Sequence, residues 1–396
     1  MKKNKFLVLA VMIAATALSW TMVIKNCNNG SKLYRRYICS AQRHEEKQAY
    51  ITAAENYIKA LELDPGNYDL IIKIAQNYYN CDDKNSFVQY CNMALSADPM
   101  QTKPYILMCD YYCQRDEYSM ALKVLSSAHL CDEIADKINS IRYEYKKGYK
   151  TFAAVKGFYN GYAAVQSEKG KWGITDTLGH TMLPYKYDEI GGAYDPEEDV
   201  IAVCSENEWY FSDIMGRKKY VPDRKCSFIG SYSCGYSPFE CDGKYGYMNL
   251  EYEEFNYEYD FAGAFSDGIA AVMKDGKWAL IDSKFKNITD FVYDSVELDK
   301  YGFCSSYGLI HAEREGVRIC IDLKGNKTEE KEKYMCGVRP YSEEGYWGYC
   351  NTDTDFVIDA MYEETLPFTG DGSAFVKENG IWYIISLKIY ENQNIL

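Results

Sequence analysis

The chain has 396 residues, a net charge of −14, 47% hydrophobic residues and 15% aromatic residues. This composition excludes a generally disordered protein and leaves room for two or three domains. The charge is unevenly spread, because the first 44 residues hold eight Lys and Arg residues and no acidic one. The 36 basic and 58 acidic residues that follow give a net of about −22. Such an acidic body argues against nucleic acid as a partner.

The N-terminus contains a long uncharged segment. Phe6–Ile24 is 19 residues without a charge and follows three lysines. At ~1.5 Å per residue a helix of this length spans roughly 28 Å, close to the ~30 Å hydrocarbon core of a bilayer. The segment Ala15-Thr16-Ala17 resembles a signal cleavage site, whereas the apolar run beyond it favours an uncleaved anchor. We predict a signal anchor or transmembrane segment over residues 1–30.

The side of the membrane that holds the rest of the chain is ambiguous. Basic residues flank the apolar segment on both sides, so the positive-inside rule discriminates weakly. The 15 cysteines are scattered and contain no C-x-x-C pair, so neither a zinc site nor a disulfide framework is legible. Free thiols indicate a cytosolic domain or an anaerobic habitat. The signal-like N-terminus favours export, and we predict an extracytoplasmic body.

Residues 31–147 repeat with a period of 34. Ala60, Ala94 and Ala128 lie 34 residues apart, as do Pro65 and Pro99. Small side chains let two helices approach closely, and each Asp-Pro step ends a helix because proline cannot donate the next backbone hydrogen bond. The pattern predicts an array of helix pairs over 33–62, 68–97 and 102–130, with a capping helix near 131–147.

The small and aromatic positions of this period resemble the tetratricopeptide repeat. In the second unit they are Ala75, Tyr78, Ala94 and Pro99. The resemblance implies a peptide-binding scaffold whose concave face is lined by the first helix of each pair. A structural spacer or a dimerisation surface is the alternative. The residues that would line the concave face are Gln42, Asp69, Gln76, Tyr79 and Asp110.

Residues 148–396 contain a second repeat, a phrase that occurs seven times. In each copy a turn precedes an aromatic residue, and a hydrophobic strand then ends on Asp, Asn or Ser. Successive aromatic positions are 37, 36, 33, 40, 29 and 35 residues apart, with Arg318 at the fifth. Period-2 patterns and the Asp275-Gly276 hairpin signal predict antiparallel strands. The aromatic residues are Trp172, Trp209, Tyr245, Trp278, Trp347 and Trp382.

The phrase resembles the bacterial WG repeat. Lys171-Trp172-Gly173 followed by the tail Pro184 to Asp188 is a near-full match, whereas the fifth unit lacks the aromatic residue. Repeats of this length indicate either a β-propeller of about seven units or an open stack of β-hairpins. The segment Tyr149 to Phe158 resembles an orphan last strand, and its pairing with the final unit would close a ring. The predicted fold class is multi-domain α plus β: a transmembrane helix, an α-solenoid and an all-β repeat domain.

No residue constellation indicates catalysis. Asp176, Asp213, Asp282 and Asp322 form a series, but an Asp followed by a turn glycine is typical of backbone capping. The repeated tryptophans could stack on sugars, although their fixed register favours a place between repeats. The four histidines are far apart, and no nucleophile, phosphate-loop or zinc motif occurs. We expect no catalytic, cofactor-binding or metal-binding residue.

These features predict a membrane-anchored, non-catalytic scaffold for protein–protein interaction. Its expected partner is a protein or peptide, with membrane contact through Phe6–Ile24 and no nucleic acid or cofactor. A cell-surface protein that binds carbohydrate or cell wall is the alternative, with a glycan as partner. A hydrolase with a propeller catalytic domain is a third hypothesis, because propellers can assemble a site from distant loops.

Overall fold

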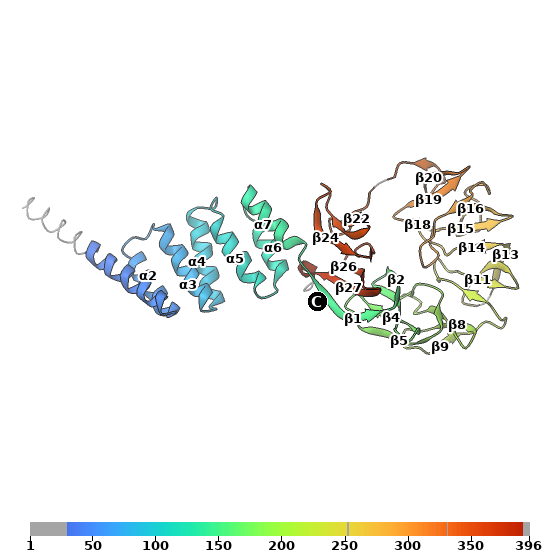
Figure 1. The fold of residues 1–396 in the computed structure, drawn as a ribbon, viewed down its shortest axis with the longest axis horizontal. Coiled ribbons are helices and arrows are strands. Elements are labelled where there is room, and N and C mark those ends of the chain that lie inside the picture. The colour runs from blue at the N-terminus through green and yellow to red at the C-terminus, as the bar shows by residue number, and fades with distance from the viewer. Residues whose placement is uncertain (1–29, 252, 331, 391–396) are drawn as a thin grey trace, which may run out of the picture. The chain divides into compact units, whose positions relative to one another are not determined.

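The computed structural model describes residues 30–251, 253–330 and 332–390, which form two compact units. The helical unit extends to Glu144 and the β unit covers Tyr145–Tyr390 (Figure 1). The predicted span Phe6–Ile24 lies outside the described residues. Among the described ones, no helix combines the length and the apolar character that crossing a membrane requires.

The helical unit is a succession of antiparallel helix pairs. Residues 30–46 are helical. The side chain of Asn67 caps the helix that begins at Tyr68 by accepting the N–H of Leu70 at 3.1 Å, and the side chain of Asp83 caps the helix that begins at Lys84 by accepting the N–H of Ser86 at 3.1 Å. The helix expected over 131–147 ends at Arg142, and strand β1 begins soon after it. The remaining helices are α2 (Tyr50–Leu61), α3 (Tyr68–Asn80), α4 (Lys84–Ala97), α5 (Lys103–Cys113), α6 (Tyr118–Ser126) and α7 (Asp132–Arg142).

Four small residues of the 34-residue period lie in the packed interior of the helical unit, whereas Ala128 follows the end of α6 and is only partly buried. Ala60, Ala75, Ala94 and Cys109 are fully buried. Larger side chains at these positions would separate the two helices, since protein interiors are packed to crystal-like density. The period at these four positions therefore reflects contact between helices.

The β unit is a ring of seven sheets in the described residues, which makes it a seven-bladed β-propeller (Figure 1). Every blade is antiparallel. In blades 2 to 7 a two-residue turn joins the central strands, as at Asp275-Gly276, where both residues have positive φ. In blade 1 the five residues 167–171 take its place. Blades 1 to 4 contain β2 (Ala154–Tyr159), β3 (Tyr162–Gln166), β4 (Trp172–Asp176) and β5 (Thr181–Tyr187); β6 (Glu189–Ile190), β7 (Ile201–Ser205), β8 (Glu208–Ser212) and β9 (Lys218–Tyr220); β10 (Phe228–Ile229), β11 (Ser237–Cys241), β12 (Lys244–Met248) and β13 (Glu254–Tyr259); and β14 (Phe261–Ala262), β15 (Ile269–Lys274) and β16 (Lys277–Asp282). Blades 5 to 7 contain β17 (Ser295–Val296), β18 (Ser305–Ser306), β19 (Leu309–Arg314), β20 (Val317–Asp322) and β21 (Lys327–Thr328); β22 (Arg339–Glu343), β23 (Tyr346–Cys350) and β24 (Phe356–Tyr362); and β25 (Glu364–Thr365), β26 (Ser373–Glu378) and β27 (Ile381–Leu387), before the short helix η1 (Lys388–Tyr390).

The ring is closed by the first strand of the unit. Strand β1 (Tyr145–Phe152) pairs with β27, with Tyr145 opposite Leu387 and Phe152 opposite Trp382. This pairing confirms the predicted closure and rules out the open stack of hairpins. The predicted orphan strand is shorter than expected at its C-terminal end, because residues from Ala154 onward form β2 of blade 1.

The glycine of the WG phrase lies at a break in strand register. The pairing of β4 with β5 shifts between Trp172 and Ile174, so that Gly173 has no direct partner on β5. A Cβ at Gly173 would lie 2.5 Å from the carbonyl oxygen of Leu183, and the equivalent position at Gly348 has the same kind of backbone obstruction at 2.3 Å from Ile358. The glycine therefore lets the fourth strand cross close to the third at a β-bulge.

Gly173→Ala is accordingly expected to destabilise the β unit by about 2–3 kcal/mol, because the obstructing atoms belong to the backbone and must shift. The matched control is Gly370→Ala, where an added Cβ meets nothing within 4 Å. Denaturant unfolding of the two variants measures the difference. Equal stability would mean that the bulge does not require glycine.

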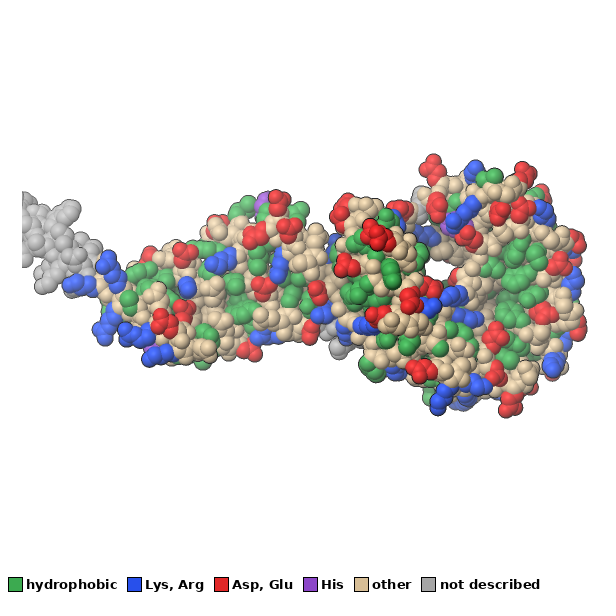
Figure 2. Space-filling model, in the orientation of Figure 1, with side chains coloured by type: hydrophobic (Ala, Val, Ile, Leu, Met, Phe, Trp, Pro, Cys, Tyr) green, Lys and Arg blue, Asp and Glu red, His purple; other side chains and the backbone are tan. Residues whose placement is uncertain are grey.

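In blades 1 and 3 an aspartate at the end of the phrase links the blade to the next one. Asp188 forms an ion pair with Lys171 and also accepts the N–H of Glu206, which lies in the hairpin of the following blade. Asp260 repeats this with Lys244 at 2.6 Å and the N–H of Asp275 at 2.7 Å. The lysine lowers the pKa of both carboxyls, and the backbone N–H lowers it further. Acidic and basic side chains accordingly lie interspersed over the rim of the β unit (Figure 2).

Candidate functional site

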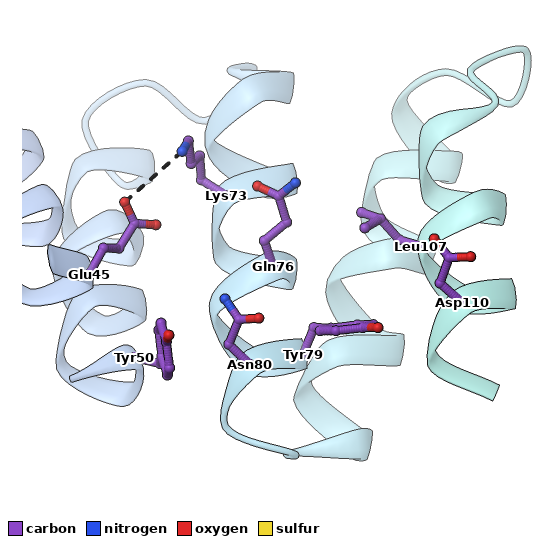
Figure 3. A pocket seen from close by; sticks show the side chains of 8 residues that line it. All are labelled: Glu45, Tyr50, Lys73, Gln76, Tyr79, Asn80, Leu107 and Asp110. Carbon is purple, nitrogen blue, oxygen red and sulfur yellow. Dashed lines mark ion pairs between the residues drawn. The ribbon is translucent and has the colours of Figure 1, made fainter. Parts of the chain in front are cut away.

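The helical unit contains a groove of about 440 Å³ (Figure 3). It is formed by the end of helix 30–46, the start of α2 and one face each of α3 and α5. Its position on the first helices of successive pairs is the one expected for a concave face. The lining side chains are Glu45, Tyr50, Lys73, Gln76, Tyr79, Asn80, Leu107 and Asp110.

Two amide side chains lie at the centre of the groove. Gln76 and Asn80 are four residues apart on α3 and therefore project from the same face of the helix. Within the described residues, neither amide has a hydrogen-bond partner in the protein. Each amide offers both a donor and an acceptor, as the backbone of an extended peptide does.

The charged residues of the groove are already paired. Glu45 accepts hydrogen bonds from Tyr57 at 2.8 Å and Asn77 at 2.7 Å, and it lies 4.0 Å from Lys73. Asp110 forms an ion pair with Lys137 at 2.7 Å. The groove thus offers neutral amide groups between compensated charges, and this suits a peptide main chain better than a single strongly charged group.

An aromatic wall borders the groove. Tyr79 packs edge-on against Phe87 and Tyr111, with ring centroids 5.5 and 5.6 Å apart. Burial raises the pKa of Tyr79, and the nearby Asp110 carboxylate adds to the effect. Tyr79 is therefore a neutral phenol held in a fixed orientation at the edge of the groove.

The structure gathers three of the five residues predicted for the concave face. Gln76, Tyr79 and Asp110 line the groove, whereas Gln42 and Asp69 are exposed outside it. Sequence reasoning missed Glu45, Tyr50, Lys73, Asn80 and Leu107. Lys73 and Asn80 share the helical face of Gln76 and were accessible to a periodicity argument. Tyr50 was not, since it belongs to a second helix.

A segment of blade 5 contacts three other blades of the propeller. The Tyr301 hydroxyl, buried in the unit, accepts the N–H of Ala164 at 2.9 Å and donates to the carbonyl of Gly157 at 2.7 Å. Ser231 donates to the carbonyl of Tyr301 at 2.8 Å, and Ala264 donates to Gly302 at 2.9 Å. Residues 297–304, here called the axial plug, therefore join blades 1, 3 and 4 to blade 5.

Beside the axial plug there is a small cavity of about 90 Å³. Lys156 and Lys300 reach it and donate to the carbonyls of Ile190 at 2.5 Å and Val155 at 3.1 Å. Burial lowers the pKa of Lys156, whereas the Glu189 and Asp299 carboxylates raise it. Lys156 thus links blade 1 to blade 2, and Lys300 links the blade 5 segment to blade 1, both through backbone carbonyls.

The carboxylate series consists of turn caps. Asp176, Asp282 and Asp322 each accept two backbone N–H groups from the residues that follow them, at 2.7–3.0 Å. Each lies in its own blade, so the series does not form one carboxylate cluster. In residues 30–251, 253–330 and 332–390, no group of three or more His, Cys, Asp and Glu side chains could hold a metal ion.

The repeat aromatics differ in exposure. Trp209 and Trp382 are 7% and 4% exposed, and Trp172, Tyr245 and Trp278 are partly buried. They pack on the neighbouring blade; the ring centroids of Tyr245 in blade 3 and Phe261 in blade 4, for example, are 5.0 Å apart. Trp347 differs from the others, because 36% of it is exposed.

Fold and repeats together define a β-propeller with an N-terminal array of helix pairs. The protein-family model of the WG containing repeat matches residues 172–209, 255–278 and 347–382, so the β unit contains WG repeats. Two of these matches begin at Trp172 and Trp347, each directly before the bulge glycine described above. A WG-repeat propeller fits a protein-interaction module.

Several solved structures are similar to this chain at low identity. The Cps50 (Swd1) beta-propeller domain of Myceliophteria thermophila is 9% identical with a TM-score of 0.36, and the match covers 61% of this chain and 99% of that one. BamB from Moraxella catarrhalis is 11% identical with a TM-score of 0.30, and the match covers 59% of this chain and 85% of that one. The extracellular domain of the putative hybrid two component system BT4673 from B. thetaiotaomicron is 11% identical with a TM-score of 0.37. This match covers 62% of this chain and 42% of that one. No curated protein matches the chain.

Proposed function

We propose that the chain is a membrane-anchored, non-catalytic scaffold that binds an extended peptide segment of a partner protein in the groove of its helical unit. The observation that carries the proposal is the pair of unpartnered amides on Gln76 and Asn80 at the centre of that groove. The resemblance to tetratricopeptide repeats supports the same site. The closed propeller acts as a second, rigid interaction module.

The chemistry of the groove limits the class of ligand. An extended peptide satisfies the two amides through its main chain, and the rings of Tyr50 and Tyr79 accommodate apolar or aromatic side chains beside it. Lys73 lies 4.0 Å from Glu45, and Lys137 pairs with Asp110 at 2.7 Å, so both cations beside the groove already have an acidic neighbour in the described part of the chain. We therefore propose a peptide without a cluster of acidic residues.

Selection from a random peptide library on the immobilised full chain tests this function. Selected peptides are expected to bind the Gln76→Ala, Asn80→Ala double variant at least tenfold more weakly, since two buried peptide hydrogen bonds are lost at ~1 kcal/mol each. Gln89→Ala, an exposed glutamine on α4, is the control and should bind unchanged. Failure to select any peptide, or equal binding to the double variant, would contradict the proposal.

The proposed location is the membrane, with a single N-terminal anchor at Phe6–Ile24 and both units outside the cytoplasm. It is supported by the uncharged length of that segment alone. Protease added to intact cells is expected to degrade the helical and β units. Complete protection, with digestion only after lysis, would place both units in the cytoplasm.

Carbohydrate binding is a second candidate, favoured by one observation. Trp347 on β23 is 36% exposed, and an exposed indole ring is suited to stacking on a sugar ring. Binding to a glycan array that disappears in Trp347→Ala would support it. An array without signal would leave the peptide groove as the binding site.

A further inference from the structure

Two cysteines lie against each other in the core of blade 3. The Cys241 thiol is 3.0 Å from the sulfur of Cys226, and the two residues are 0% and 4% exposed. By comparison, Cys109 and Cys113 on successive turns of α5 have their sulfurs 3.9 Å apart. The pair in blade 3 therefore stands much closer to bonding distance, which is ~2.05 Å for a disulfide.

The backbone on both sides of the pair is already held in place. The N–H of Ser227 donates to the carbonyl of Glu240 at 2.9 Å, immediately inside the two cysteines. Outside them, the Arg224 guanidinium donates to Asp242 at 3.0 Å and to the hydroxyl of Tyr257 at 3.0 Å. Tyr257 in turn donates to the carbonyl of Cys241. A bond between the sulfurs thus requires side-chain rotation and little backbone movement.

We propose that Cys226 and Cys241 are a disulfide site, closed when the chain folds in the presence of a disulfide oxidant. One cysteine thiolate attacks the oxidant disulfide, which forms a mixed disulfide and releases one oxidant thiolate. The second cysteine thiolate attacks the protein sulfur of the mixed disulfide, and the other oxidant thiolate leaves. Two electrons pass to the oxidant, and the two thiol protons end on its released thiols.

The bond joins the inner edge of blade 3 to its second strand. It closes the loop that carries β10 and the exposed Cys234, and it crosses the cluster formed with Phe239 and Met248. Burial raises the pKa of the Cys226 thiol, and the contact with Cys241 raises it further. The folded pair therefore reacts slowly in either direction, so the redox conditions during folding decide its state.

The test is thiol mapping on the full chain that carries Cys234→Ser. The chain is refolded with reduced and oxidised glutathione, free thiols are alkylated under denaturing conditions, and trypsin with a Glu-specific protease cuts after Lys225, Glu240 and Lys244. The expected product is peptide 226–240 linked to peptide 241–244, lighter by two hydrogens than the sum of the two. The oxidised chain should also melt roughly 5–10 °C higher than the reduced chain.

Alkylation of both Cys226 and Cys241 in the refolded chain would overturn the proposal, as would linkage of either one mainly to other cysteines. Cys241→Ser should abolish the linked product and the rise in melting temperature. Cys109→Ser is the matched control and should change neither. The mapping needs no variant of the proposed pair, so a folding defect in Cys241→Ser does not affect its outcome.

Discussion

Replacing Phe152 by alanine is expected to destabilise the β unit by about 3–5 kcal/mol. Phe152 is 1% exposed at the end of the closing strand β1, where it packs edge-on against Phe375 with ring centroids 5.9 Å apart. The substitution leaves a cavity in the cluster that joins blade 7 to blade 1. Because a propeller without its closure has two exposed sheet edges, aggregation should accompany the loss of stability.

The same strand supplies the control. Tyr149 is 88% exposed on β1, so Tyr149→Ala should change stability by at most ~0.5 kcal/mol. Urea unfolding followed by tryptophan fluorescence distinguishes the two variants. Similar midpoints for both would show that β1 contributes little to closure.

Tyr301→Ala is the second substitution with a large expected effect, also about 3–5 kcal/mol. It removes the buried ring of the axial plug together with both hydrogen bonds to blade 1. Tyr301→Phe isolates the hydroxyl: it leaves the N–H of Ala164 without its buried partner, at a cost of ~1–3 kcal/mol. Thermal unfolding of both variants gives the two contributions.

Tyr307→Phe is the matched control, because Tyr307 lies in the same blade and is 65% exposed. It should unfold like the parent chain. If Tyr301→Phe also unfolds like the parent, the axial plug packs into the ring without bonding it, and the role assigned to its hydroxyl is wrong.

The blade number was predictable because the repeated phrase has a local cause. An aromatic residue after a two-residue turn, and a glycine where the outer strand crosses, depend on neighbours within one blade. Closure of the ring was also predictable from a local pattern. The segment that begins at Tyr149 resembles the last strand of a repeat, but no complete repeat precedes it. The end of that strand was not predictable, because only the pairing separates the two sides: Phe152 pairs with the distant Trp382 of β27, and Ala154 with the nearby Gln166 of β3.

The axial plug could not be predicted, because its contacts join residues far apart in the sequence. Tyr301 bonds to Ala164, 137 positions away. Its only sequence signal is the 40-residue interval between Trp278 and Arg318, the longest of the six. An insertion is visible there, but a single chain does not reveal where the inserted residues pack.

The groove was predictable in part. Helical period placed Gln76 and Tyr79 on one face of α3, and the 34-residue repeat placed Asp110 on the next first helix. Gln42 lies too early on its helix to reach the groove, which begins at Glu45 near the helix end. Where a groove begins and ends depends on how the pairs stack, and the repeat period does not contain that information.

Site-specific photo-crosslinking in intact cells tests the central claim most directly. A photoreactive phenylalanine analogue replaces Tyr79 in the groove or Gln89 on the outer helix α4. We expect a discrete crosslinked partner from position 79 that is absent from position 89 and disappears when Gln76 and Asn80 are both alanine. Identical products from both positions, or a product from position 79 that survives the double substitution, would contradict the peptide-binding groove.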